Sequence, residues 1–441
     1  MTTPVRDTLM RRLDALEADL GAPSRYVIAF SGGLDSTVLL ASLAALDRKV
    51  PILAVHVDHQ LQAASGDWAE TARSMAARLD IECRVERVRP DARSGKGPEG
   101  AARDARYAAL AAQLEPGDWL LSAHHADDQV ETLFLNLLRG SGPDGLAAMP
   151  ECRQLGAGWL VRPFLKVTRE QLAETAAELG LTWIDDPSNA ECDFDRNYLR
   201  HTVLPRIAER WPDSVLRLSR SIERQQEASA LLADIGLADV LQLGRPDRLD
   251  ADGLRELSAA RQRNALRSAI RLSGLPVPQA TVIEALMSDV LPARDDAEPH
   301  VAWPGGEARR FRGMIYLMAP VADAPSTTLP FDGERLELPA GLGSLALEAV
   351  DGPGLNPDLL AAGLVVRWRE GGERLRPAAD GRTRTVKKLL QEAAIVPWMR
   401  PRLPLLYAGD ELVAVADRFL AAEASATPGL KVRWLDHPSI E

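Results

Sequence analysis

The 441-residue chain has few cysteines, and none of them are closely spaced. Cys83, Cys152 and Cys192 are the three it has, and they stand far apart. A disulfide framework, a structural zinc site and an iron–sulfur cluster all need clustered thiols, so the spacing argues against each of them. Sulfur transfer through paired cysteines is disfavoured for the same reason.

Long apolar runs are also missing from the sequence. No segment reaches the roughly 20 apolar residues of a membrane span, and the first 20 residues carry charges throughout instead of an apolar signal core. We therefore expect a cytoplasmic protein with no membrane partner. The net charge is −11, from 52 Lys and Arg against 63 Asp and Glu. An acidic total does not favour nucleic-acid binding, which would need a local basic patch.

The first part of the chain alternates between strand and helix patterns. Such alternation predicts an α/β fold with a parallel sheet that helices cover on both faces. Ligands of such sheets bind at the carboxyl ends of the strands. The expected strands are 26–30, 50–59, 81–88 and 118–125, and the expected helices are 37–46, 67–79, 102–114 and 126–140. SGGLDS, HVDH and AHHADD all fall at expected strand ends, so we expect them to converge on one pocket.

The alternation fades after residue 205, and three domains are predicted. The pattern is helical over 213–291, with long helices expected at 214–242 and 253–274. From residue 300 it turns to strands, punctuated by proline and glycine. We predict a parallel-sheet, Rossmann-like domain over 1–212, a mostly helical middle domain over 213–325 and a small mixed α+β domain over 326–441.

The segment SGGLDS at 31–36 joins an expected strand to an expected helix. Its glycines let a ligand approach the main chain, and Ser36 and Thr37 can cap the helix. Backbone N–H groups at such a helix end favour phosphate. Asp35 would repel bare phosphate, so it fits best facing a Mg²⁺ ion that the phosphate carries. The segment is neither a GxxxxGK[ST] nor a GxGxxG loop, and an ordinary strand-to-helix turn would also explain it.

The loop resembles the signature of the PP-loop ATP pyrophosphatases, and five further blocks narrow the resemblance. HVDHQL (56–61), EGAARDARY (99–107), the segment 123–149, RPFL (162–165) and the segment 186–205 resemble the tRNA(Ile)-lysidine synthetases. Together these blocks span most of residues 26–205. The sequence departs from the family at Gln60 and Gln62, where the family usually has Gly and Arg.

This resemblance implies a complete reaction. Members of the family attach L-lysine to C2 of the wobble cytidine of an isoleucine tRNA, tRNA(Ile), with anticodon CAU. ATP and Mg²⁺ activate the cytidine through an adenylated intermediate, and AMP and pyrophosphate are released. The modified anticodon reads AUA instead of AUG. By the same resemblance, Ser31, Gly32, Gly33, Leu34, Asp35 and Ser36 would bind ATP, and Asp35 would also hold Mg²⁺.

The resemblance also implies roles for residues beyond the loop. His124, Asp128 and Glu131 stand at i, i+4 and i+7 and could share one face of a helix start. We expect Asp35, His124 and Asp128 to be catalytic. The lysine ε-ammonium, with a pKa of about 10.4, must lose a proton before it attacks. His124 and Asp128 are both open as the base, and a helix start that merely prefers acids would also explain the pattern.

Four further side chains are expected to contact substrates. Glu131 and Arg103 are assigned to the charged groups of the amino acid, by carry-over from the family. Arg196 and Arg200, spaced i, i+4, are assigned to triphosphate or tRNA phosphate. A solvated basic face is the plainer interpretation of Arg103 and its neighbour Arg106.

A local basic patch lies near the C-terminus. Residues 366–402 hold ten Lys and Arg against four Asp and Glu, a net charge of +6, with Trp368 and Trp398 interleaved. Phosphate contacts of this kind give affinity without reading sequence. The segment resembles the C-terminal domain of the longer lysidine synthetases, so we expect RNA contact here, including Lys387 and Lys388. A charged surface over core tryptophans would also fit, and the sequence leaves open whether the chain forms a homodimer.

Three other functions are weaker explanations of the sequence. A PP-loop tRNA thiolase usually needs paired cysteines, which the chain lacks. A glutamine-fed amidotransferase would need a separate domain with a cysteine nucleophile. A non-catalytic ATP-binding regulator has little use for Asp35, the acidic helix start or a basic tail.

Overall fold

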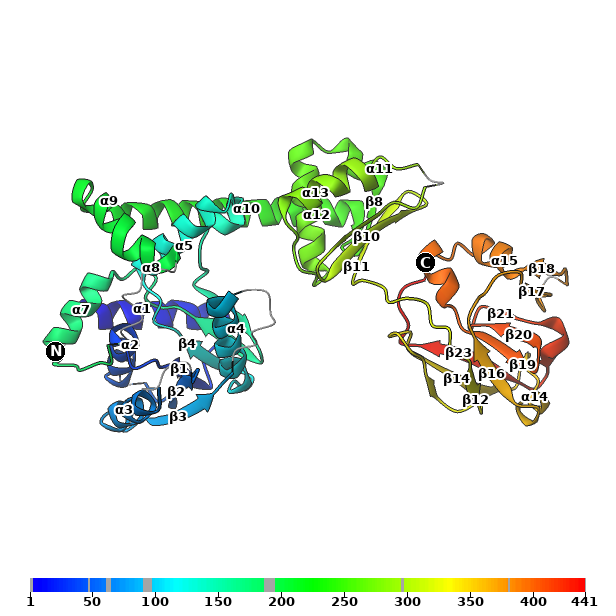
Figure 1. Cartoon of the computed structure of the whole chain (residues 1–441), viewed down its shortest axis with the longest axis horizontal. Coiled ribbons are helices and arrows are strands. Elements are labelled where there is room, and N and C mark those ends of the chain that lie inside the picture. Colours follow the sequence, from blue (N-terminus) through cyan, green and yellow to red (C-terminus); the bar gives the residue numbers. More distant parts are fainter. Residues whose placement is uncertain are drawn as a thin grey trace. The chain divides into compact units, whose positions relative to one another are not determined.

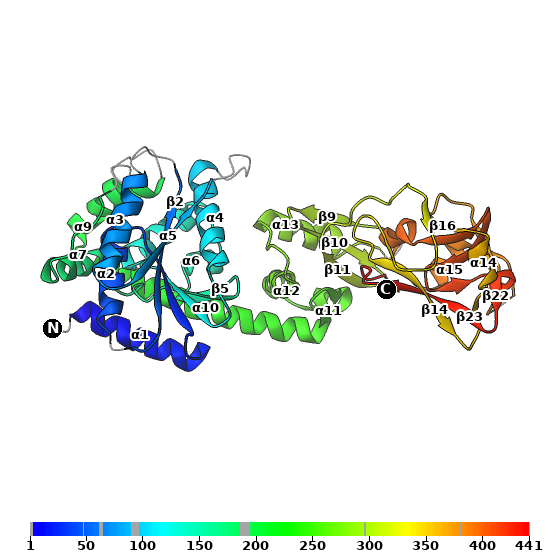
Figure 2. The same ribbon diagram turned by 90° about the horizontal axis from the view of Figure 1, so that it is seen from below.

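The computed structural model describes residues 3–46, 48–60, 65–89, 97–185, 195–294, 297–379 and 381–440. It divides into two compact units, Met1–Leu231 and Leu232–Glu441, and Figures 1 and 2 show the ribbon of the chain. The domain boundaries expected near residues 212 and 325 remain predictions.

Unit 1 is built around a six-stranded sheet in the order β3-β2-β1-β4-β6-β5. Neighbours among the first five of these are parallel, while β5 runs antiparallel to β6. The α/β fold expected from the sequence is confirmed, but the β5–β6 hairpin was not predicted. The strands are β1 (Arg25–Ala29), β2 (Ile52–Asp58), β3 (Glu82–Arg87), β4 (Asp118–Leu121), β5 (Cys152–Leu155) and β6 (Gly158–Val161).

Helices cover both faces of this sheet. Figures 1 and 2 place α1 and α2 on one side and α4 on the other. The helices that begin in unit 1 are α1 (Pro4–Leu20), α2 (Leu34–Ala44), α3 (Ser65–Ala77), α4 (Gly97–Ala112), α5 (Ala126–Leu138), α6 (Pro143–Leu146), α7 (Arg169–Glu178), α8 (Asp195–Tyr198), the π-helical η2 (Leu199–Val203), α9 (Leu204–Arg210) and α10 (Ser214–Leu243).

Alternating strand residues build two cores. In β1, Tyr26 and Ile28 face α1, α2 and α7, where Leu9, Leu13 and others are fully buried. Val27, between them, points to the opposite face and packs with Leu110 of α4. Each such buried side chain contributes roughly 2 kcal/mol of apolar transfer free energy. The two cores fix the sheet between its helices, and with it the loops at the strand ends.

The strand order puts two loops at a switch point of the sheet. The chain leaves β1 toward β2 and β3 on one side and continues with β4 and β6 on the other. Loops after β1 and β4 therefore leave the sheet in opposite directions, and ligands of open α/β sheets bind at such a switch point. Residues 31–36 follow β1, and residues 122–125 follow β4.

Of the two long helices expected after residue 213, one is present as a single helix and the other is divided in two. The helix expected at 214–242 is α10 (Ser214–Leu243). The single helix expected at 253–274 is wrong, because the structure has α11 (Ala251–Glu256) and α12 (Ala259–Leu272) instead. Leu257 and Ser258 adopt extended backbone between them. The apolar periodicity runs through this break, so the pattern could not reveal it.

Unit 2 contains three five-stranded sheets. Their strand orders are β7-β8-β11-β10-β9, β12-β16-β19-β20-β21 and β13-β14-β23-β15-β22, and β17 pairs with β18. The strands expected from residue 300 onward are thereby confirmed, with antiparallel pairing throughout these sheets. The elements up to residue 361 are β7 (Gly244–Arg245), β8 (Arg248–Asp250), α13 (Ala280–Ala285), η3 (Leu286–Val290), β9 (His300–Trp303), β10 (Gly306–Phe311), β11 (Met314–Met318), β12 (Leu329–Phe331), β13 (Leu336–Glu337), β14 (Ser344–Val350), β15 (Gly354–Leu355) and α14 (Asp358–Ala361). They are followed by β16 (Leu364–Arg367), β17 (Arg374–Leu375), β18 (Arg384–Thr385), α15 (Val386–Glu392), η4 (Pro397–Arg402), β19 (Leu405–Ala408), β20 (Glu411–Val415), β21 (Phe419–Leu420), η5 (Ala422–Ala424), β22 (Ser425–Ala426) and β23 (Gly429–Leu435).

Two absences expected from the sequence can be examined in the described residues. No helix among them is long and apolar enough to cross a membrane. Cys83 and Cys152 are both free thiols. Cys192 lies outside the described residues.

Strand β6, which pairs with β4, depends on a glycine for this close approach. A Cβ at Gly158 would lie 2.4 Å from the carbonyl oxygen of Asp118, and neither backbone can yield. We predict that Gly158→Ala costs about 2 kcal/mol and lowers the melting temperature of the full chain by about 4 to 8 °C. Gly66→Ala in α3 is the control, because its Cβ meets open space. Equal melting temperatures for the two variants would contradict the close approach.

Candidate active site

The loop at 31–36 is held in shape by its own glycines and serines. Gly32 has φ +81°, and a Cβ there would lie 2.6 Å from the Ile184 side chain. Its carbonyl oxygen accepts a hydrogen bond from the Ile184 N–H at 2.9 Å. The positive φ and the nearby Ile184 side chain both favour glycine at position 32.

Two serines close the loop across its mouth. The hydroxyls of Ser31 and Ser36 lie 3.0 Å apart, and Ser31 Oγ also accepts the Gly33 N–H at 3.3 Å. Ser36 donates to the Gly33 carbonyl at 3.1 Å. Helix α2 begins directly after Gly33, so its first N–H groups, which have no partner within the helix, face the loop. The predicted ATP-binding residues thus form one preshaped turn at a helix N-terminus.

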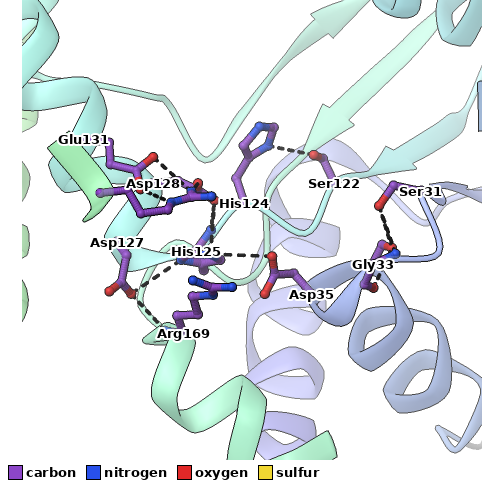
Figure 3. Close-up of polar contacts among 12 residues, drawn as sticks. Ser31, Gly33, Asp35, Ser122, His124, His125, Asp127, Asp128, Glu131 and Arg169 are labelled. Atoms are coloured by element: carbon purple, nitrogen blue, oxygen red, sulfur yellow. Dashed lines mark hydrogen bonds and ion pairs between the residues drawn. The ribbon is translucent and has the colours of Figure 1, made fainter. Parts of the chain in front are cut away.

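His125 joins this loop to the loop after β4. Its Nε2 atom lies 3.6 Å from Asp35 Oδ2 and 3.5 Å from Asp128 Oδ2, while Nδ1 lies 3.4 Å from Asp127 Oδ2. Figure 3 shows the ring between Asp127 and Asp35. The expected convergence of SGGLDS and AHHADD is therefore confirmed. No role in the site was predicted for His125, although it stands in the same motif as His124.

The three carboxylates decide the charge of His125. The ring is 1% exposed, and this burial lowers its pKa, but hydrogen bonds and charges from Asp127, Asp35 and Asp128 outweigh the burial and raise the pKa to about 10. The imidazole is therefore protonated at neutral pH. It supplies the positive charge that lets several acidic side chains meet at the switch point.

His124 points in a different direction and, unlike His125, is neutral. In Figure 3 it points toward Ser122, whose Oγ lies 2.7 Å from His124 Nδ1. Burial lowers the pKa of His124 to about 3, and Arg162, Arg106 and Arg196 add to this while Asp128 opposes it. Two adjacent histidines of one motif thus differ in charge, because burial keeps His124 neutral while carboxylates outweigh the burial of His125.

Asp128, Glu131, Arg196 and Arg200 form one buried charge network. Arg196 reaches Asp128 Oδ1 and Glu131 Oε2, both at 2.7 Å. Arg200 reaches Asp128 Oδ1 at 3.0 Å and Glu131 Oε1 at 2.6 Å. The arginines come from α8 and η2, so two positive and two negative groups fasten this segment to α5. Asp128 was expected to be catalytic, Glu131 to bind the amino acid and both arginines to bind phosphate, whereas in the structure the four side chains contact one another.

The network also determines the acidity of Asp128. Burial raises the pKa of its carboxyl group, but His125, Arg196, His124 and Arg200 together lower it well below the usual value. Its Oδ2 atom accepts the His125 backbone N–H at 3.0 Å, while Oδ1 serves both arginines. Asp128 is therefore ionised and fully engaged on both oxygens.

The remaining predicted contacts are not members of this network. Arg103 is exposed on α4, with its guanidinium 5.8 Å from the centre of the Tyr107 ring. Lys387 and Lys388 are exposed in the first turn of α15, in unit 2. Gln60, which replaces the family's usual glycine, has φ 54°, a left-handed backbone conformation. Gln62 and residues 186–194 lie outside the described residues.

A metal at this site would depend chiefly on Asp35. Across the described ranges, no group of three or more His, Cys, Asp or Glu is arranged to hold a metal ion by itself. Asp35 Oδ1, however, is buried and accepts no hydrogen bond from the described part of the chain. Mg²⁺ commonly takes one or two protein carboxylates and completes its shell with substrate phosphates and water. One vacant carboxylate oxygen beside the turn at 31–36 fits that pattern.

Family models match three parts of the chain and define its class. A PP-loop domain matches residues 5–207, a TilS substrate binding domain matches 249–316, and a TilS substrate C-terminal domain matches 364–434. With its loop at the N-terminus of α2, unit 1 therefore carries the ATP-using domain of the PP-loop class.

Curated relatives specify the family within that class. The tRNA(Ile)-lysidine synthase of Alkalilimnicola ehrlichii is 44% identical over 98% of this chain and 97% of its own. That of Methylococcus capsulatus is 38% identical over 96% and 99%, and that of Pseudomonas aeruginosa is 44% identical over 89% of each. The chain belongs to the tRNA(Ile)-lysidine synthase family, a family of ATP-dependent ligases.

The protonated His125 predicts how stability depends on pH. The folded pKa of about 10 lies above the ordinary value of 6.5, so the folded state holds a proton that the unfolded state loses above pH 6.5. Stability from this group is complete below pH 6.5 and is lost as pH rises to about 10. We expect the melting temperature in EDTA to fall from pH 7 to 10, and His125→Gln to flatten that fall.

His56→Gln serves as the control for this measurement. His56 is also buried, but burial lowers its pKa, so it carries no extra proton in this pH range. Its variant should keep the wild-type pH slope. A His125→Gln variant with the wild-type slope would show that the imidazole is neutral in the folded protein.

Proposed function

We propose that this chain attaches L-lysine to C2 of the wobble cytidine of tRNA(Ile) with anticodon CAU. The reaction uses ATP, passes through an adenylated cytidine and releases AMP and pyrophosphate, so that the tRNA reads AUA instead of AUG. The observation that carries the proposal is the similarity to tRNA(Ile)-lysidine synthases over nearly the whole chain. The preshaped turn beside Asp35 and His125 supports it.

The turn at 31–36 would hold the pyrophosphate part of ATP. The donors are the hydroxyls of Ser31 and Ser36, the main chain of Gly32 and Gly33, and the N-terminus of α2 at Leu34. Such fixed donors stabilise charge that develops on a leaving pyrophosphate and keep it in line with the attacking oxygen. Asp35 stands at the edge of this turn, where it would hold Mg²⁺ through its vacant Oδ1. Bound Mg²⁺ would neutralise phosphate charge.

His125 would position Asp35 for this task. It lies against Asp35 Oδ2, leaving Oδ1 for the metal, and it ties the turn to the start of α5. Asp127 supports the ring from the other side and accepts the Arg169 N–H at 2.8 Å, which links α7 to the same assembly. Asp128, Glu131, Arg196 and Arg200 would act as a rigid charged support for the lysine- and tRNA-binding surface.

Neither candidate base is suited to hold the lysine proton. A general base works best with a pKa near the working pH. The pKa of His124 is about 3, and Asp128 is more acidic than an ordinary carboxyl group. We therefore propose that the ε-ammonium loses its proton to solvent. Neutral His124 then positions the free amine by accepting a hydrogen bond on the ring nitrogen opposite Ser122.

Several finer expectations stay proposals. Arg103 is assigned to the lysine or tRNA substrate, and Lys387 and Lys388 to tRNA phosphate, which agrees with their exposure. Location in the cytoplasm and assembly into a homodimer also remain predictions.

Radiolabelled lysine tests the proposed reaction directly. With ATP, Mg²⁺ and a tRNA(Ile) transcript bearing CAU, we expect acid-precipitable label that survives mild alkali, because a C–N bond resists the treatment that cleaves an ester. A transcript bearing GAU, which has no wobble cytidine, should take up no label. AMP release without label would instead favour another PP-loop reaction, and neither product would favour an ATP-binding regulator.

Asp35→Asn tests the place of Asp35 within that assay. We expect at least a roughly 100-fold loss of label, since the variant removes a charge that would act on the reacting phosphates. Asp67→Asn is matched to it, because Asp67 also lies in the first turn of a helix, α3, but is exposed. Full activity of Asp35→Asn would remove Asp35 from the site.

The pH profile distinguishes solvent deprotonation from a histidine base. At low lysine concentration, kcat/KM should rise about tenfold per pH unit between pH 6.5 and 8.5, following the free amine. His124→Gln should lower the rate and keep the slope, because a neutral ring loses no proton in this range. An inflection near pH 6 to 7 that disappears in His124→Gln would identify His124 as the base.

A further inference from the structure

Tyr107 of α4 is surrounded by arginines, of which only Arg103 has been assigned to a substrate above. The guanidinium groups of Arg103, Arg106 and Arg153 lie 5.8, 5.5 and 5.5 Å from the centre of its ring. Arg162, directly after β6, acts on the hydroxyl of Tyr107 through its charge and a hydrogen bond. Burial raises the pKa of Tyr107, but Arg106, Arg162 and Arg103 outweigh it and lower the pKa below its ordinary value. Four positive charges from one helix and the β5–β6 hairpin thus meet at one side chain.

These charges are not neutralised by ion pairs in the described part of the chain, although Asp128 acts on Arg106 through its charge. No ion pair with a described carboxylate is formed by Arg103, Arg106, Arg153 or Arg162. Arg162 is only 3% exposed. Its Nη1 donates to the Pro150 carbonyl at 2.7 Å. Its Nε is buried and has no hydrogen-bond partner among the described residues. Buried charge without an opposite charge is costly. Burial and neighbouring arginines accordingly lower the pKa of both Arg106 and Arg162.

The charges of two of these arginines reach His124. Arg162 and Arg106 are close enough to His124 to lower its pKa by their charge, and Arg106 does the same to His59 after β2. Arg103 and Arg153 are exposed, whereas Arg162 is buried. The cluster therefore leads from the protein surface toward His124.

We propose that these four arginines bind phosphodiester groups of the RNA substrate next to the nucleotide that reacts. The proposal rests on the proposed function, because it needs an RNA strand whose base enters the site near His124. A free amino acid offers one carboxylate, which would leave most of the cluster unbalanced, whereas consecutive phosphates can pair with several guanidinium groups. ATP phosphates have their own turn at 31–36. Such contacts position a strand without reading its sequence.

The two exposed arginines allow a test that spares the buried ones. In the double variant Arg103→Gln/Arg153→Gln, we expect weaker binding of the tRNA(Ile) transcript in a filter assay. The slope of log Kd against log salt should fall by about 1 to 2, since each lost phosphate contact removes roughly 0.7 to 0.9. An unrelated tRNA should lose the same factor of affinity. The assay contains no ATP or lysine, so it does not depend on catalysis.

Two control proteins complete the experiment. Arg84→Gln changes an exposed arginine on β3, at the opposite edge of the same sheet from β5, and should leave the slope unchanged. Arg103→Lys/Arg153→Lys keeps both charges and should recover most of the slope. Melting temperatures within a few degrees of wild type would show that all three proteins are folded.

The outcomes separate this inference from the proposed function. A double Gln variant with unchanged tRNA binding and a raised KM for lysine would overturn the proposal and give the cluster to the amino-acid carboxylate. Unchanged values of both would overturn it as well. A reduced salt slope in a chain that makes no lysidine would keep the RNA contact and reject the proposed reaction instead.

Discussion

The site depends on one protonated imidazole placed among three carboxylates. Asp35 lies in the first turn of α2, and Asp127 and Asp128 lie in the first turn of α5. Like charges at such short range would push the two helix starts apart. His125 supplies the opposite charge inside the protein, where little water is present to screen it. The loop at 31–36 and the start of α5 are thereby held together before any substrate arrives.

The charge pattern continues outward from this histidine in alternating sign. Asp128 receives positive charge from His125 on one oxygen and from two arginines on the other, and Glu131 balances those arginines. His124, one residue away, belongs to the other electrostatic region, where arginines gather around Tyr107. The site thus has an acidic side suited to a metal and a basic side suited to anions, and the two adjacent histidines mark the border between them.

Much of this arrangement could be predicted from the sequence, because it is encoded locally. The SGGLDS turn, the alternation of strands and helices and the convergence of loops at strand ends all follow from short-range patterns. Pairings across long sequence distances could not be predicted. Nothing in the spacing of Arg196 and Arg200 indicates Asp128 as a partner 68 and 72 residues away. The same holds for Arg162 near Tyr107, because the β5–β6 hairpin that positions it was not predicted. No role in the site was predicted for His125, because adjacent residues in a turn point in directions that only the backbone determines.

The long sequence separation of these ion pairs has a consequence for how the chain acquires its site. Contacts between residues about 70 positions apart form only after the intervening chain has been ordered, and the entropy of closing such loops slows their formation. The β1–α2 turn and the start of α5 can take shape locally, but Arg196 and Arg200 meet their partners only once β4, β6 and α7 are in place. The charged centre is therefore a late product of folding, and a nascent chain has no complete site until residue 200 has been synthesised and docked.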